Sequence, residues 1–560
     1  MRNIKNYLIA AFALLSLDSC DYLDYDETSG KTTDEVFSYF NNINSSVAHI
    51  YSFLPTDFGR VNQAMMESAT DNSIYTWENN SITYFTNGVW SPLKCVDSGW
   101  EFWEGIRCAN LFLENFDIKE LERFQYNEDY DEIIEKASKF TFEVRFLRAF
   151  YLFELAKRYG DIPLITRTYT QEEINAVKKS SFSEVINFIE KECTDITAEG
   201  GLPEEGLRGE TGRVTKGAAL ALKSRALLYA ASELYNPKHD LNKWKAAAKA
   251  AYEVIKMNKY QLQNISSDPL YSDLGGNEIF KSKQLIFERR STELSNSFES
   301  RNEPMGYEGA QGGNTPTQNL VDAYEMKDGT PFDWNNPEHV ANMYYDSNHE
   351  ETRDPRLYKN ILVNGSTWQK QTIETFEGGK NKVLDGSTRT GYYLRKYMNP
   401  SVSLDPDKPN KLHHHYILFR YAEILLNYAE AMNEWKGKNV SAPDEGCPMT
   451  ALEAINKVRI SANMKAIDEN ESYFTDRVRN ERRVELAFEG HRFYDIRRWK
   501  IASSENVRNI YGIRIIKNNS SYRYEKVLLQ HSHWEDKMYL FPYPQNEIYL
   551  NPNLGQNPGW

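Results

Sequence analysis

Cysteine is scarce in this chain, with five residues among 560, and long apolar runs are missing. The mean hydropathy of −0.66 and the 26% of charged residues exclude a polytopic membrane protein. No CxxC pair occurs, so neither a zinc ribbon nor a CxxC redox motif is expected. In an oxidising compartment, one disulfide could form among the four cysteines beyond the N-terminus. These are Cys95, Cys108, Cys193 and Cys447.

An excess of basic residues is missing as well. The chain has 66 Lys and Arg against 80 Asp and Glu, a net charge of −14. Non-specific nucleic-acid binding needs a basic surface, so we expect no nucleic-acid partner. The sequence also contains no Walker loop, no GxSxG and no EF-hand spacing, and we predict no cofactor. A structural Ca²⁺ in the acidic loops is left open, although no motif indicates one.

The N-terminus has the pattern of a secretory signal. A basic start precedes an apolar run over residues 7–17, which is shorter than the roughly 20 residues that span a bilayer. Cys20 then follows Leu-Asp-Ser, a sequence that is similar to the lipobox of bacterial lipoproteins. We therefore expect a lipoprotein signal peptide over residues 1–19 and an acylated Cys20 as lipid anchor. An ordinary secretory signal with cleavage nearby is the alternative.

Helical periodicity dominates two parts of the chain. From Phe142 to Tyr159, apolar side chains recur four, three, four and three residues apart, which makes one stripe along a helix. Similar segments come in pairs over about 138–260 and 416–500. Two capping boxes mark the start of the second helix of a pair: Ser181 with Glu184, and Thr450 with Glu453.

Two other parts lack this period. Residues of about 60–99 and 262–412 are rich in Gly, Asn, Asp, Pro and Tyr and predict loops with short strands. Irregular segments of this length inside a compact body are usually functional surfaces. We expect a single body over residues 20–560, with helix pairs as its frame and these two segments on the ligand side.

Several motifs from end to end resemble the SusD/RagB family of surface nutrient-binding lipoproteins of Bacteroidetes. The acidic segment after Cys20 is similar to the export signal of such lipoproteins. The most specific motifs are C-terminal. The motifs that carry the resemblance are Trp100-x-x-Trp103-x-x-Ile106, Arg145 to Tyr151, Arg158 to Pro163, Arg479 to Arg492, Asp495 to Trp499, Phe541 to Pro544 and Asn551 to Trp560.

The resemblance implies a mainly α fold in which four tetratricopeptide-like helix pairs form a frame with long irregular loops and short strands. It also implies a location and partners. Family members are anchored by lipid on the outer face of the outer membrane, capture an oligosaccharide, and deliver it to a SusC-like TonB-dependent transporter. They bind and do not cleave, so we expect no catalytic residue.

Sugar recognition needs aromatic faces for C–H groups and planar polar side chains for hydroxyl edges. Trp100 and Trp103 lie at helical spacing and are assigned to the core. The aromatic and polar residues of the irregular segments have no such periodic explanation. They are the candidate ligand residues: Asp71, Asn72, Trp77, Tyr84, Trp90, Tyr307, Trp334 and Tyr392.

The sequence is also compatible with three other functions. A peptide replaces the glycan in the RagB branch of the family. A surface glycosidase would use Glu485 and Glu489, which lie four residues apart on one helical face, although helix ion pairs are the favoured interpretation of these charges. A plain repeat scaffold would bind only protein. His413, His414 and His415 do not predict a metal site, because consecutive residues point to different sides.

Overall fold

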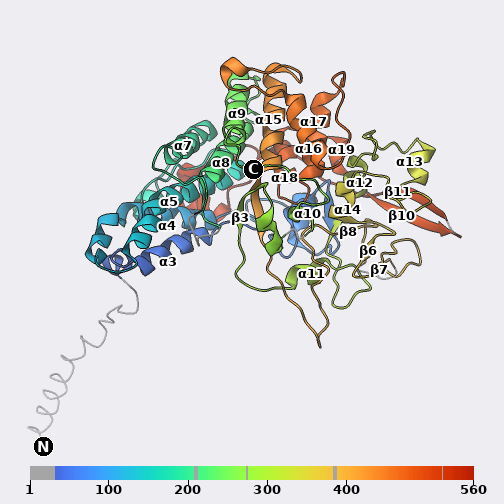
Figure 1. The fold of residues 1–560 in the computed structure, drawn as a ribbon, viewed down its shortest axis with the longest axis horizontal. Helices are drawn as coiled ribbons and strands as arrows, with labels where there is room; N and C mark the ends of the chain where they lie inside the picture. Colours follow the sequence, from blue (N-terminus) through green and yellow to red (C-terminus); the bar gives the residue numbers. More distant parts are fainter. Residues whose placement is uncertain (1–31, 207–211, 273–274, 383–386, 520) are drawn as a thin grey trace, which may run out of the picture.

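The computed structural model describes residues 32–206, 212–272, 275–382, 387–519 and 521–560. Helices form the left and upper parts of the molecule in Figure 1, and short strands with long loops form the lower right. No helix among these residues is both long enough and apolar enough to cross a bilayer. The predicted signal peptide and Cys20 lie outside the described residues.

Three helix pairs of the expected kind are present. The structure pairs α5 with α7, α8 with α9, and α15 with α16, and α9 also packs against α15. Both predicted capping boxes are confirmed, at the starts of α7 and α16. The long helices are α3 (Phe40–Tyr51), α4 (Glu101–Asn115), α5 (Tyr130–Tyr159), α7 (Phe182–Ile196), α8 (Lys216–Ala231), α9 (Leu241–Ile255), α15 (Tyr421–Lys436), α16 (Ala451–Ser461), α17 (Phe474–Glu485) and α18 (Arg492–Arg498).

Helix α8 shows why the frame is compact. It contacts α7, α9 and α15, and nearly all of its side chains are buried. Its alanines let the neighbouring helices approach closely. Its Arg225 is buried too, and pairs with Glu423 of α15 through two hydrogen bonds of 2.7 Å. The helical frame is thus held by both apolar contacts and buried ion pairs.

The remaining helices are short, and five of them lie within the irregular segment over residues 262–412. The largest buried cluster of apolar side chains spans both parts of the molecule. These helices are α2 (Thr33–Phe37), α6 (Gln171–Ile174), α10 (Pro269–Ser272), α11 (Ser297–Asn302), α12 (Gln318–Ala323), α13 (Pro337–Ala341), α14 (Pro355–Asn360), α19 (Glu505–Arg508) and α20 (Gln545–Leu550).

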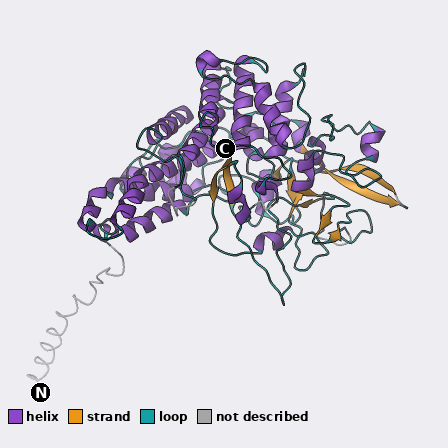
Figure 2. Ribbon diagram, in the orientation of Figure 1, coloured by secondary structure: helices purple, strands orange, loops and turns teal. Residues whose placement is uncertain are grey.

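The strands form small antiparallel sheets in the middle and on the right side of Figure 2. One sheet joins the two irregular segments, because β2 (Ser73–Tyr75) pairs with both β1 (Ala69–Thr70) and β4 (Asn314–Pro316). The other pairs are β3 (Leu285–Arg289) with β9 (Tyr416–Arg420), β5 (Ile361–Leu362) with β8 (Tyr393–Leu394), β6 (Thr367–Trp368) with β7 (Gln371–Thr372), and the long pair β10 (Asn509–Asn518) with β11 (Ser521–His531).

The C-terminal segment returns to the helices α4 and α5. The backbone N–H of Phe541 donates to the carbonyl of Arg158 at 2.8 Å, and the Asn557 side chain donates to the carbonyl of Tyr159 at 2.9 Å. The Trp560 indole N–H donates to the carbonyl of Lys537 at 2.9 Å. Residues 541–560 therefore form a fixed layer over the end of α5.

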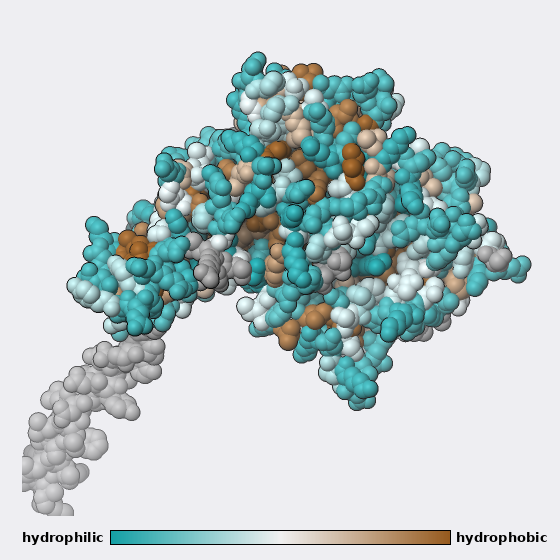
Figure 3. All heavy atoms as spheres, viewed as in Figure 1, coloured by the Kyte–Doolittle hydropathy of each residue, from teal (hydrophilic) through white to brown (hydrophobic). Residues whose placement is uncertain are grey.

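The surface is consistent with the charged composition. The face in Figure 3 is mostly hydrophilic, and apolar side chains gather there only in small separate patches. All four cysteines that the structure describes are free thiols. The disulfide that the sequence left open is not formed among them.

Candidate functional site

Trp77 is the sequence-predicted aromatic residue with the most open ring. It follows β2, and 44% of its surface is exposed. The pairing of β2 with β4 continues past the strand, since the N–H of Thr76 donates to the carbonyl of Gly313 at 2.8 Å. The Trp77 indole N–H then donates to the carbonyl of Gln311 at 3.0 Å. The ring edge is thus fixed while a substantial part of the ring faces solvent.

Charged side chains lie next to this ring in the chain. Glu78 forms an ion pair with Arg389 at 3.0 Å, and the Glu78 side chain is 74% exposed. A carboxylate and a guanidinium at the surface can accept from and donate to sugar hydroxyl groups. Glu78 is thus the chain neighbour of Trp77, and its ion pair brings in Arg389 from a segment far away in the sequence.

Tyr307 lies in the same loop that holds the Trp77 edge, four residues before Gln311. Its ring is half-buried, and its hydroxyl donates to the carbonyl of Trp368 at 3.0 Å. The indole N–H of Trp368 in turn donates to the Glu303 carboxylate at 2.6 Å. Burial raises the pKa of Glu303 to about 7. The loop over residues 303–313 thus connects Tyr307 with the anchor of Trp77.

Trp334 belongs to a different surface. Its indole N–H lies 3.1 Å from both carboxylate oxygens of Asp322, and its ring is half-buried. Lys526 of β11 pairs with Asp322 at 2.7 Å and lies 6.0 Å from the centre of the Trp334 ring. These contacts connect α12 to the β10 and β11 pair.

The prediction of Trp90 as an open platform is wrong. Only 2% of its surface is exposed, because its ring packs edge-on against three other aromatic rings. The ring centres of Phe85, Phe541 and Trp560 lie 4.7, 4.8 and 5.1 Å away. Two of these partners come from the C-terminal segment. Trp90 therefore belongs to the core that joins the early loop to residues 541–560.

Asp71 and Asn72 are also buried, which contradicts their prediction as ligand contacts. Arg492 donates two hydrogen bonds of 2.8 Å to the Asp71 carboxylate, and Arg483 lies 2.9 Å from it. Although burial opposes ionisation, these two guanidinium groups lower the pKa of Asp71. Asn72 accepts from Arg483 at 2.7 Å and donates to Glu67 at 2.6 Å. Both residues attach the early loop to the C-terminal helices.

Tyr392 is the fourth candidate that the structure removes. Its ring is fully buried, and its hydroxyl donates to Gln318, whose amide donates to Asp322 at 2.6 Å. Tyr392 therefore belongs to the same hydrogen-bond network as Trp334, to which it is linked through Gln318 and Asp322. Tyr84 is half-buried in a short 3₁₀ turn, with the Lys94 ammonium 5.8 Å from its ring centre. The structure gives Tyr84 no contact with Trp77.

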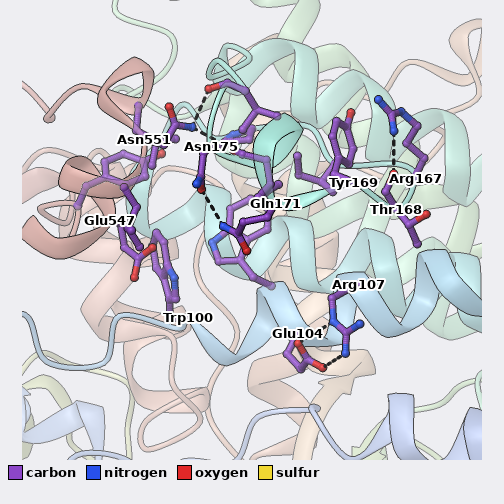
Figure 4. Close-up of a pocket in the computed structure, with 18 residues that line it drawn as sticks. Trp100, Glu104, Arg107, Arg167, Thr168, Tyr169, Gln171, Asn175, Glu547 and Asn551 are labelled. Atoms are coloured by element: carbon purple, nitrogen blue, oxygen red, sulfur yellow. Dashed lines mark hydrogen bonds and ion pairs between the residues drawn. The ribbon is translucent and has the colours of Figure 1, made fainter. Parts of the chain in front are cut away.

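A pocket of about 540 Å³ lies where sequence reasoning expected only core (Figure 4). The start of α4, the segment from residue 163 to α6, and α20 form its walls. Trp100 and Trp103, which the sequence assigned to the core, are only partly buried and line it. A third aromatic wall comes from Tyr543. The helical period of α4 predicted that Trp100 and Trp103 lie in the core. It could not reveal the pocket, because the opposite wall comes from the C-terminal segment.

Family models match both the N-terminal and the C-terminal part of the chain. A model of the SusD family matches residues 279–560, and a family described as starch-binding associating with outer membrane matches residues 21–228. The chain belongs to the SusD family. A SusD-like protein of Bacteroides fragilis is similar in structure, with a TM-score of 0.76 at 29% identity, over 94% of this chain and 98% of that chain.

Two further relatives of this SusD-family protein extend the comparison. A SusD-like carbohydrate binding protein of Bacteroides fragilis has a TM-score of 0.72 at 26% identity, over 93% of this chain and 99% of that chain. SusD-like protein P25 of Formosa agariphila is 22% identical over 534 residues, which cover 89% of this chain and 90% of the relative. The expected family and the mainly helical fold are thus confirmed.

As a SusD-family member, the chain is a binding protein and not an enzyme. The geometry of Glu485 and Glu489 agrees with this. Glu485 accepts from Arg420 at 2.5 Å and from Arg356 at 2.8 Å, and its side chain is 2% exposed. These two cations hold the pKa of Glu485 well below its usual range, although burial opposes this. A buried carboxylate that stays ionised cannot donate a proton to a glycosidic oxygen.

The three consecutive histidines of this SusD-family chain have separate structural partners. The ring of His414 lies 2.9 Å from the carboxylate of Glu299, and the ring of His415 lies 3.0 Å from the amide of Asn277. Among the described residues, no group of three or more His, Cys, Asp or Glu side chains is arranged to hold a metal ion.

Proposed function

We propose that this protein captures oligosaccharides at the cell surface and delivers them to a partner TonB-dependent transporter in the outer membrane. The observation that carries the proposal is the half-open indole of Trp77, which is anchored at its edge and accompanied by Glu78 and Arg389. An anchored aromatic ring is ready for the apolar face of a sugar, and it loses little conformational entropy on binding.

The comparisons support the same class of ligand and location. One similar structure is that of a carbohydrate binding protein, and one matching family is described as starch-binding and associated with the outer membrane. The lipobox-like sequence before Cys20 supports a lipid anchor. Because the surface around Trp77 is open to water, a single sugar chain should bind there with modest affinity.

Calorimetry with a panel of defined oligosaccharides tests the ligand. We expect saturable binding without release of reducing ends, and we expect Trp77→Ala to weaken it at least about tenfold because the apolar contact is lost. Tyr126→Ala is the matched control, since it removes an aromatic ring that is 91% exposed elsewhere on the surface. Equal affinity of Trp77→Ala and wild type would show that the ligand binds elsewhere. Binding of peptides and of no sugar would favour the RagB-like alternative.

The anchor and the partner need separate measurements. Cys20→Ala should abolish labelling by palmitate and move the protein from the membrane fraction to the soluble fraction. Purification of the tagged wild-type protein from detergent-solubilised outer membranes should retain a TonB-dependent transporter. Recovery of the protein alone, under conditions that keep other outer-membrane complexes intact, would contradict the proposed partnership.

A further inference from the structure

The pocket between α4, α6 and α20 has the composition of a carbohydrate site. Aromatic rings of Trp100, Trp103, Tyr169 and Tyr543 line it. Trp100 stands edge-on to Trp103 and Tyr543, with ring centres 6.2 and 6.3 Å apart, so the walls present rings at several angles. Volumes of about 300–1,000 Å³ are typical of small-molecule sites, and this pocket lies within that range.

The two guanidinium groups of the pocket are already paired. Arg107 donates two hydrogen bonds, of 3.0 and 2.7 Å, to Glu104 of the same helix. Arg167 donates to Glu173 at 2.8 Å and lies 3.9 Å above the centre of the Tyr169 ring. Because each guanidinium has a carboxylate partner, the pocket has no free guanidinium with which to hold an anion, and burial raises the pKa of the Glu547 carboxyl group that also lines it. It favours a neutral ligand.

Polar groups on the rim remain open. The Gln171 amide nitrogen donates to the Asn175 side-chain oxygen at 3.1 Å, as Figure 4 shows. The Gln171 oxygen and the Asn175 nitrogen make no hydrogen bond to another described residue, which leaves one acceptor and one donor beside the aromatic walls. The buried indole nitrogen of Trp103 likewise has no acceptor among the described residues. Buried polar groups without a partner are rare in folded proteins.

We propose that this pocket is a second carbohydrate subsite, which holds roughly one or two neutral sugar residues against Trp100, Trp103 and Tyr543. Gln171 and Asn175 would bind their hydroxyl groups. The inference rests on the proposed function. An acyl chain would fill the apolar walls but leave both rim amides without partners, and an anionic ligand would have to compete with the carboxylates that already pair with Arg107 and Arg167.

The subsite is separate from Trp77. None of the residues that line it comes from the Trp77 loop or from the 303–313 loop. A short oligosaccharide therefore binds the two sites independently, whereas a polysaccharide that reaches both gains affinity because the second contact is intramolecular.

The test uses the full mature protein and four probes: maltohexaose, laminarihexaose, cellohexaose and mannohexaose. In a Trp77→Ala background, which isolates the pocket, we expect residual saturable binding of at least one hexasaccharide in calorimetry. Addition of Gln171→Ala and Asn175→Ala should weaken that binding at least tenfold. Gln125→Ala with Asn127→Ala is the matched control, because it removes the same exposed residue types in another turn and should change nothing.

The outcomes separate the two proposals. Sugar binding that depends on Trp77 but not on the rim amides overturns the subsite and leaves the proposed function intact. No binding of any sugar by the wild type overturns both. Tyr169→Ala should reproduce the rim variant, and unchanged melting temperatures would exclude unfolding as the cause.

Discussion

The helices α17 and α18 and the loop after β2 contain similar kinds of side chain but use them in opposite ways. In the helical region, Glu485 and its partner Arg420 are 2% and 1% exposed, and several hydrogen bonds satisfy each of them. In the loop, Glu78 is 74% exposed and has one ion-pair partner, Arg389. Planar charged groups and aromatic rings therefore indicate a candidate ligand surface only where their donors and acceptors are exposed to solvent.

The difference has an energetic basis. Removing an ion from water is costly, and a buried ion pair repays that cost only if every partner stays in place. An exposed pair is solvated already and contributes little to stability. Substitutions should therefore divide into those that unfold the protein and those that alter only binding.

Arg420→Met should have the largest effect. It leaves Glu485 and Glu489 buried with fewer cationic partners, so the free energy of unfolding should fall by about 3–5 kcal/mol. Urea unfolding followed by circular dichroism measures this. Arg514→Met is the control, because Arg514 pairs with Glu377 at an exposed position and its loss should cost less than about 1 kcal/mol. Similar losses in both variants would remove the distinction between the two regions.

Trp90→Ala should destabilise the protein by roughly 3–5 kcal/mol, because it leaves a cavity among Phe85, Phe541 and Trp560. Trp77→Ala, which removes the same side chain from the surface, should change stability by less than about 1 kcal/mol. Thermal unfolding of the two variants gives the comparison. A normal melting temperature for Trp90→Ala would show that this aromatic cluster does not hold the early loop in place.

Glu303→Gln should change the pH dependence of stability. Burial raises the pKa of Glu303 to about 7 in the folded state, above the value of about 4.3 in an unfolded chain. At a pH between these two pKa values, Glu303 is deprotonated in the unfolded chain but still protonated in the folded protein. The free energy of unfolding of the wild type should therefore fall by roughly 3 kcal/mol as pH rises from 4.5 to 7. The variant still accepts from Trp368 and should lack this decrease. Parallel stability curves for wild type and variant between pH 4.5 and 8 would contradict the expectation.

Arg389→Met should give the smallest change in stability, less than about 1 kcal/mol, because its ion pair with Glu78 is exposed. Sugar affinity should nevertheless fall several-fold, since one hydroxyl partner beside Trp77 is lost. Calorimetry and urea unfolding on the same preparation separate the two effects. A stability loss as large as that of Arg420→Met would place Arg389 among the structural ion pairs.

The sequence predicted the helical frame better than the site. Apolar period and capping boxes are local signals, and they found α5, α7 and α16. Nothing local distinguishes Trp77 from Trp90, because the rings that bury Trp90 come from the C-terminal segment. The pocket beside Trp100 was hidden for the same reason. The pairing of β10 with β11 was not predicted at all, although its strands are long.

The C-terminal segment has a consequence for biogenesis. Residues 541–560 supply two of the rings that bury Trp90 and one wall of the pocket at Trp100. During synthesis and export the helices α4 and α5 emerge long before these residues do. Until then Trp90 and the start of α4 lack the C-terminal rings that cover them, and a chain truncated before residue 541 would keep that apolar surface exposed. The pocket is therefore complete only after the C-terminal segment has packed against α4 and α5.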